Sequence, residues 1–111
     1  MDKLSDYRKT IERVLTDYAA VPYSNSNAKT EPIFDYERDR YLLVNVGWDN
    51  GKRMHGCLVH VDIIEGKFWI HRDGTEDGIA ADLERAGVPK SDIVLAFHAP
   101  ELRKHTEYAV A

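Results

Sequence analysis

The sequence predicts an α+β fold, in which an N-terminal helix packs on a meandering antiparallel β-sheet of about four strands, followed by a helix and a short helical C-terminal segment. Three observations support this prediction: a helical period in the first twenty residues, a period of two from Pro32 to Asp73, and two short turn signals within that second region. A chain of 111 residues suits one domain with one core, so we expect residues 1–111 to form a single domain.

Apolar side chains recur every three or four residues along the first twenty positions. They are Leu4, Tyr7, Ile11, Val14, Leu15 and Tyr18, with charged residues between them. This spacing places them on one stripe of a helix, which should be buried against another element. We expect Pro22 and the polar segment 24–29 to end the helix and form a loop.

Four later segments are rich in β-branched and aromatic residues, as strands usually are. They span residues 33–37, 40–48, 53–63 and 67–72. Asn50-Gly51 separates the second from the third and is the strongest short hairpin signal, because both residues accept the positive φ of a type I′ turn. Glu65-Gly66 is a weaker signal of the same kind between the third and fourth.

Two-residue turns at these positions fix a strand register. Counting from them pairs Leu42 with Val59, Tyr41 with His60, and His60 with His71. One face then collects the apolar side chains of Leu42, Val44, Val46, Cys57, Val59, Val61, Ile63, Phe68 and Ile70. The other collects Tyr41, Leu43, Asn45, Leu58, His60, Asp62, Trp69, His71 and Asp73. A one-residue slip would mix the two sets, so their separation supports the register. The apolar first face is the expected seat of the N-terminal helix.

The remainder of the chain predicts a second helix before Gly87, with Thr75 or Asp77 as the cap at its start. We expect this helix and the C-terminal tail near the second face of the sheet. Residues 91–98 fit either a buried strand or a return rich in turns, and Pro100 favours a short last helix.

The second face holds the candidate functional residues. If His60 and His71 were opposite, their Cβ atoms would be roughly 5 Å apart, close enough to share a metal ion, and Asp62 and Asp73 could complete the site. Alternation alone also places polar residues on the less buried side of a sheet, and we favour that interpretation, with no metal and no cofactor.

Trp69 is more unusual, because a solvated sheet face seldom carries Trp beside Leu and Tyr. We therefore expect this face to be covered, either by later segments of the chain or by another protein. The hypothetical partner-binding residues are Tyr41, Leu58, His60, Trp69 and His71.

Charge and composition exclude some classes of function. The net charge of −4 disfavours direct binding to nucleic acid, which usually needs a basic face. One cysteine, Cys57, allows no intrachain disulfide, and no apolar run approaches the roughly 20 residues that cross a membrane. The N-terminus lacks the pattern of a secretory signal, so we expect a cytoplasmic protein.

Three segments carry a resemblance to a known family. They are MDKLSDYRKTIERVLTDYA, YLLVNVGWDNGKRMHGCLVHVDI and WIHRDGTEDGIAADLERAGVPKSDIVLAFHAPELRKHTEYAVA. Together they resemble the XisI family, the controlling factors for excision of the fdxN element in cyanobacteria. The resemblance implies a role beside a recombinase in DNA rearrangement in heterocysts, with a companion protein of the XisH family. It implies no catalytic residue, cofactor or reaction.

These observations lead to one expected function and several alternatives. We expect an accessory or regulatory protein without enzymatic activity, which binds a XisH-type partner and acts on the recombinase system only indirectly. One alternative is a small metal-binding or hydrolytic enzyme that uses His60, His71, Asp62 and Asp73. A second alternative is a factor that binds nucleic acid directly. The chain could also form a homo-oligomer.

Overall fold

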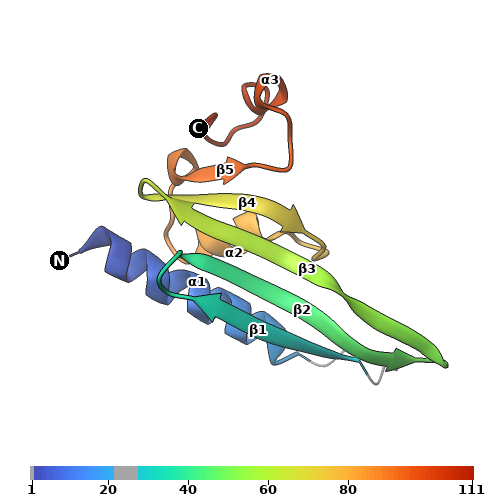
Figure 1. Ribbon diagram of the computed structural model, residues 1–111. Coiled ribbons are helices and arrows are strands. Elements are labelled where there is room, and N and C mark those ends of the chain that lie inside the picture. The colour runs from blue at the N-terminus through green and yellow to red at the C-terminus, as the bar shows by residue number, and fades with distance from the viewer. Residues whose placement is uncertain (1, 22–27) are drawn as a thin grey trace.

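The computed structural model describes residues 2–21 and 28–111. The chain begins with helix α1 (Lys3–Ala19) and continues through strands β1 (Lys29–Asp35), β2 (Arg40–Asp49), β3 (Lys52–Ile64) and β4 (Lys67–Asp73). Helix α2 (Ile79–Arg85), a 3-10 turn (Lys90–Asp92), strand β5 (Ile93–Leu95) and helix α3 (Pro100–Arg103) follow. The five strands form one sheet in chain order, in which β1 to β4 are antiparallel and β5 is parallel to β4 (Figure 1). The predicted fold class is therefore confirmed, with one strand more than expected.

Helix α1 lies on one side of the sheet, as its apolar stripe predicts. Asp2 caps its start by accepting a hydrogen bond from the backbone N–H of Leu4 at 3.1 Å. Ile11 and Leu15 are fully buried, and the ring of Tyr7 stacks on Phe68 of β4 with the centroids 4.7 Å apart. The expected loop at Pro22 and residues 24–29 lies mostly outside the described residues.

The two hairpin turns have the predicted conformation. Asn50 and Gly51 have φ angles of 51° and 77°, and Glu65 and Gly66 have 50° and 76°, as type I′ turns require. Strand β1 (Lys29–Asp35) begins and ends earlier than the strand predicted for residues 33–37. The carboxylate of Asp35 accepts hydrogen bonds from two following backbone N–H groups, each at 3.1 Å, and thereby turns the chain.

Farther from the turns, two β-bulges change the predicted register. Leu58 is an extra residue in β3, so that Val44 faces Cys57 but Leu43 faces Val59. His71 is an extra residue in β4, so that Val61 faces Ile70 but His60 faces Arg72. The predicted pairs of Leu42 with Val59, Tyr41 with His60, and His60 with His71 are therefore wrong.

The bulge at Leu58 divides the predicted apolar face between both sides of the sheet. Val59, Val61, Ile63, Phe68 and Ile70 are buried under the helices. Leu42, Val44, Val46 and Cys57 alternate to the opposite side instead, because each extra residue reverses the side to which the following residues point. Tyr41 and Leu43, predicted for the second face, are fully buried in the core.

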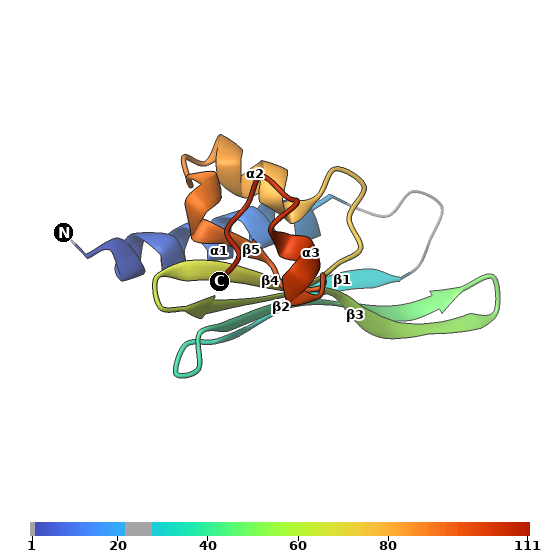
Figure 2. The same ribbon diagram turned by 90° about the horizontal axis from the view of Figure 1, so that it is seen from above.

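Helix α2 lies beside α1 on the same side of the sheet (Figure 2), and not near the second face as predicted. Ile79, Ala80 and Leu83 belong to the cluster that includes Ile11 and Leu15, and this shared burial fixes its position. The cap of α2 is also not the predicted one. The carboxylate of Asp73 accepts a hydrogen bond from the backbone N–H of Ile79 at 2.6 Å.

The C-terminal segment extends the far edge of the sheet. Residues 91–98 contain the short strand β5, whose Ile93 and Val94 are fully buried, so the buried-strand alternative is confirmed. The backbone N–H of Ala109 donates to the carbonyl of Ile93 at 2.8 Å, which places the tail against β5. Helix α3 begins at Pro100, as predicted. Among the described residues, none of the helices is both long and apolar enough to cross a membrane.

Candidate functional site

The side of the sheet opposite α1 and α2 is called the open face below. The strand register places these side chains on it: Leu42, Val44, Val46, Cys57, His60, Asp62, Trp69 and His71. Each of them is at least partly exposed. Figure 2 shows that α1 and α2 cover only the other side.

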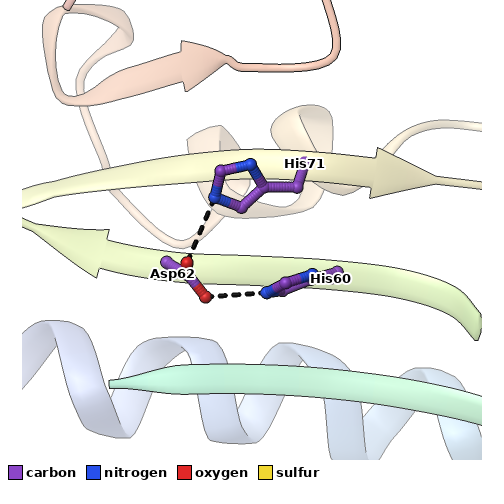
Figure 3. Close-up of side chains that lie close together, drawn as sticks. All are labelled: His60, Asp62 and His71. Atoms are coloured by element: carbon purple, nitrogen blue, oxygen red, sulfur yellow. Dashed lines mark hydrogen bonds and ion pairs between the residues drawn. The ribbon is translucent and has the colours of Figure 1, made fainter. Parts of the chain in front are cut away.

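A cluster of two histidines and one aspartate lies on strands β3 and β4 of the open face (Figure 3). The Nε2 atom of His60 is 2.8 Å from one carboxylate oxygen of Asp62, and the Nε2 atom of His71 is 3.1 Å from the other. The two imidazole rings lie 4.9 Å apart between centroids, inclined at 49°. The carboxylate of Asp62 therefore forms hydrogen bonds with both imidazoles.

The bulge at His71 sets the way in which the two histidines meet. Without the extra residue, His71 would directly oppose His60, as the sequence predicted. In the structure Arg72 takes that place, and His71 instead reaches the carboxylate of Asp62. The side chain of Asp62 is only 14% exposed, whereas those of His60 and His71 are 32% and 36% exposed. The cluster is thus open to solvent on the histidine side.

The same bulge removes Asp73 from the predicted metal set. Asp73 faces Val59, a core residue, and its carboxylate accepts hydrogen bonds from the hydroxyl and the backbone N–H of Thr75 at 2.6 and 3.0 Å, in addition to that from Ile79. Asp73 therefore organises the start of α2. Among the described residues, His60, Asp62 and His71 form the only group of three or more side chains that could hold a metal ion.

Two residues predicted for partner binding are not on the open face. Tyr41 is fully buried, and its hydroxyl donates to Asp39 at 3.0 Å. Leu58 is 8% exposed, because its side chain lies beneath Gly74, whose backbone N–H donates to the carbonyl of Leu58 at 2.8 Å. The predicted placement of both is wrong, while that of His60, Trp69 and His71 is confirmed.

Trp69 stands at the margin of the open face that the tail partly covers. The guanidinium of Arg103, from α3, lies 5.4 Å from the centre of the indole ring. Val94 faces Trp69 across the parallel pair and is fully buried beside Ala109. The C-terminal segment therefore covers the β5 edge, while Leu42 and Val44 stay partly exposed.

Two ion pairs join α1 to Asp39, in the turn before β2, and to Asp92, in the 3-10 turn before β5. Arg8 binds Asp39 through two hydrogen bonds of 2.7 and 3.0 Å, and these lower the pKa of Asp39. Burial tends to raise the pKa of Asp92, but hydrogen bonds from Lys3 and the hydroxyl of Tyr7 outweigh it and lower that pKa. Both carboxylates lie away from the His-Asp-His cluster and stabilise the fold.

A cleft of about 450 Å³ lies between α1 and α2, on the helical side of the molecule. Its lining includes the charged side chains of Arg13, Asp17, Asp82 and Arg85. No sequence pattern indicates this cleft, because it depends on how two helices that are far apart in the chain pack together.

The fold and the site together define a small α+β protein with helices on one side of its sheet and a His-Asp-His cluster on the other. The XisI protein family matches residues 1–110. A solved XisI-like protein from Anabaena variabilis ATCC 29413 is similar, with 38% identity, a TM-score of 0.88, and coverage of 97% of this chain and 99% of that chain.

A second solved structure, the fdxN element excision controlling factor XisI from Anabaena variabilis ATCC 29413, is also 38% identical to this chain. It has a TM-score of 0.83, and the match covers 99% of this chain and all of that chain (100%). The chain therefore belongs to the XisI family. No curated protein matches it.

Proposed function

We propose that this chain is an accessory factor in the excision of a DNA element and that it acts by binding another protein through its open face. The observation that carries the proposal is the sheet with helices on one side only, because its other side presents apolar side chains to solvent. The role in excision is supported by the relative described as an fdxN element excision controlling factor. The chain contributes binding, not catalysis, in this proposal.

The composition of the open face suits protein recognition. Leu42, Val44 and Trp69 are neither buried in the core nor fully solvated. Partly exposed apolar and aromatic side chains on one face often take part in an interface, where Trp and Arg often contribute most of the binding energy. Trp69 with Arg103 against its ring would be such an anchor.

The charge of the open face suggests the chemistry of the partner. The register places Arg40, Arg53 and Arg72 on the open face together with the acidic Glu31, Asp35 and Asp62. A complementary surface would have apolar side chains with charged groups of both signs around them. We propose a XisH-family protein as the partner, since the family resemblance implies such a companion, and the cytoplasm as the place of binding.

The direct test is the affinity of the purified chain for the XisH-family protein of the same cell. Val44→Glu places a charge among the apolar side chains of the open face, and Trp69→Ala removes the aromatic anchor. We expect each to weaken binding by at least about tenfold, as loss of a central interface residue commonly does. Val21→Glu is the matched control, because Val21 is 68% exposed and follows α1 outside the open face.

Other results would contradict this proposal. Full affinity in a correctly folded Val44→Glu protein would remove the open face from consideration. A dimer of the chain alone that Val44→Glu dissociates would identify a second copy as the occupant. Sequence-preferring retention of a DNA fragment by the chain alone, persisting at moderate salt, would favour direct DNA binding instead.

A further inference from the structure

We propose that His60, Asp62 and His71 bind a divalent transition-metal ion, with Zn²⁺ as the ion of choice for a first test. The candidate ligand atoms, one from each residue, all lie within 4.8 Å of one another. Two imidazole nitrogens and one carboxylate oxygen form a ligand set that is common for zinc and for other first-row metals.

Each imidazole nitrogen lies near one oxygen of Asp62 at about the spacing of coordinating atoms, the two nitrogens approach different oxygens, and the full set lies within 4.8 Å. Ligand bonds of about 2.0–2.1 Å to a tetrahedral ion place neighbouring ligand atoms about 3.3 Å apart. The Nε2 atoms of His60 and His71 lie 2.8 and 3.1 Å from the oxygens of Asp62. Small rotations of the two rings would thus admit an ion, and metal bonds would replace the present hydrogen bonds.

Strand alternation explains why these residues face the same side, and the bulge decides how His71 meets Asp62. His71 reaches Asp62 because it is the extra residue of a β-bulge, a feature that often re-aims a side chain next to a functional site. The carboxylate of Asp62 makes hydrogen bonds to both imidazoles, one through each oxygen, so both Nε2 atoms lie next to the same side chain (Figure 3).

The electrostatic surroundings set limits on the affinity. Arg40 lies across from Asp62 and Arg72 across from His60, and positive charge nearby opposes a cation. The guanidinium of Arg72 is held by the backbone carbonyl of Cys57, which accepts from its Nε at 2.7 Å. Three protein ligands also leave a coordination position for water or for an outside group, on the exposed side of the two histidines.

The test uses the full chain, purified without a histidine tag and stripped with a chelator. Zn²⁺ is titrated by calorimetry, and Co²⁺ is used as a second probe, because its visible absorption reports the coordination geometry. We expect one ion per chain. His60→Ala and His71→Ala should each weaken binding by at least about 10- to 100-fold, the loss that typically follows removal of even an outer-shell partner.

Two further variants separate loss of the metal site from a general effect on the protein. His55→Ala is the matched control, because His55 is an exposed histidine of the same strand outside the cluster, and it should bind Zn²⁺ like the unaltered chain. Asp62→Asn preserves shape while removing the charged ligand, and it should weaken binding without unfolding the protein. Equal losses in His71→Ala and His55→Ala, or no saturable binding at all, would overturn the metal site.

This inference is independent of the proposed partner. Val44→Glu should lose the partner and keep the metal, because Val44 faces Cys57 and is not one of the three ligands. A chain that binds the partner but no metal would refute the metal site alone. A chain that binds Zn²⁺ with its three ligands but no XisH-family protein would refute only the partner proposal.

Discussion

Asp73 connects the end of β4 to the start of α2, and its replacement by alanine should measurably destabilise the fold. Its carboxylate accepts three hydrogen bonds, two from Thr75 and one from the backbone N–H of Ile79. Ile79 is fully buried, so this cap positions a helix that contributes to the core. Asp73→Ala would leave the first turn of α2 without its acceptor.

The magnitude follows from ordinary hydrogen-bond energies. A hydrogen bond to a charged group contributes about 1.5–3 kcal/mol, and loss of a capping side chain costs about 0.5–2 kcal/mol. Because Asp73 is partly exposed and water would replace some of its bonds, we expect a loss of about 2 kcal/mol. With an unfolding entropy of about 2.1 cal/mol/K per residue over 111 residues, this loss lowers Tm by about 9 °C.

The assay is urea unfolding followed by circular dichroism, with Asp77→Ala as the control. Asp77 is an exposed acid that the sequence offered as an alternative cap, and its loss should change the free energy of unfolding by less than about 0.5 kcal/mol. Thr75→Val should have an intermediate effect, because the hydroxyl both donates to Asp73 and accepts from the N–H of Gly78. Equal losses for Asp77→Ala and Asp73→Ala would refute the capping argument.

Three further predictions concern the core, an ion pair and a turn. Tyr41→Ala should lower the free energy of unfolding by about 3–5 kcal/mol in urea titrations, because Tyr41 is fully buried, and a change below about 0.5 kcal/mol would place it on the surface instead. The lowered pKa of Asp39 beside Arg8 means that this carboxylate stabilises the fold above its unfolded pKa of about 3.9 and stops doing so as pH falls through the lower folded value. In Asp39→Asn, the free energy of unfolding should therefore fall less steeply below about pH 4 than in the unaltered chain. The same dependence on pH in both proteins would contradict this. Glu65→Asn should raise the free energy of unfolding by about 0.5–1 kcal/mol, because Glu65 has a φ of 50°, which Asn tolerates better, and lower stability would count against the reason given.

The turns and the first helix were predictable because their causes are local. Asn50-Gly51 and Glu65-Gly66 adopt the positive φ angles that their residue types favour, and the pairs next to each turn follow from chain geometry. The apolar stripe of α1 is likewise a property of residue spacing alone. Such features need no information from distant parts of the chain.

The candidate site was predictable only in part. His60, Trp69 and His71 were placed on the correct side, but the reason given for the proximity of the two histidines was wrong, since His71 does not oppose His60. Tyr41 was misplaced, because the extra residue Leu58 shifts the pairing of β2 with β3 by one, so that Tyr41 faces Val61 in the core and not His60. Residue types did not locate either bulge, although Leu58 and Tyr41 stood out as large side chains on a predicted face that was otherwise mostly polar.

The sequence by itself thus determined the helix, the hairpins and the order of the antiparallel strands, because short-range conformational preferences and apolar periodicity decide them. Only the tertiary structure decided the positions of the two bulges, the side on which α2 lies, and the parallel addition of β5. These depend on packing α1, α2 and the sheet around one shared core. The same packing turned Leu42 and Val44 outward and brought His71 to Asp62, which are the features from which the function and the metal site are proposed.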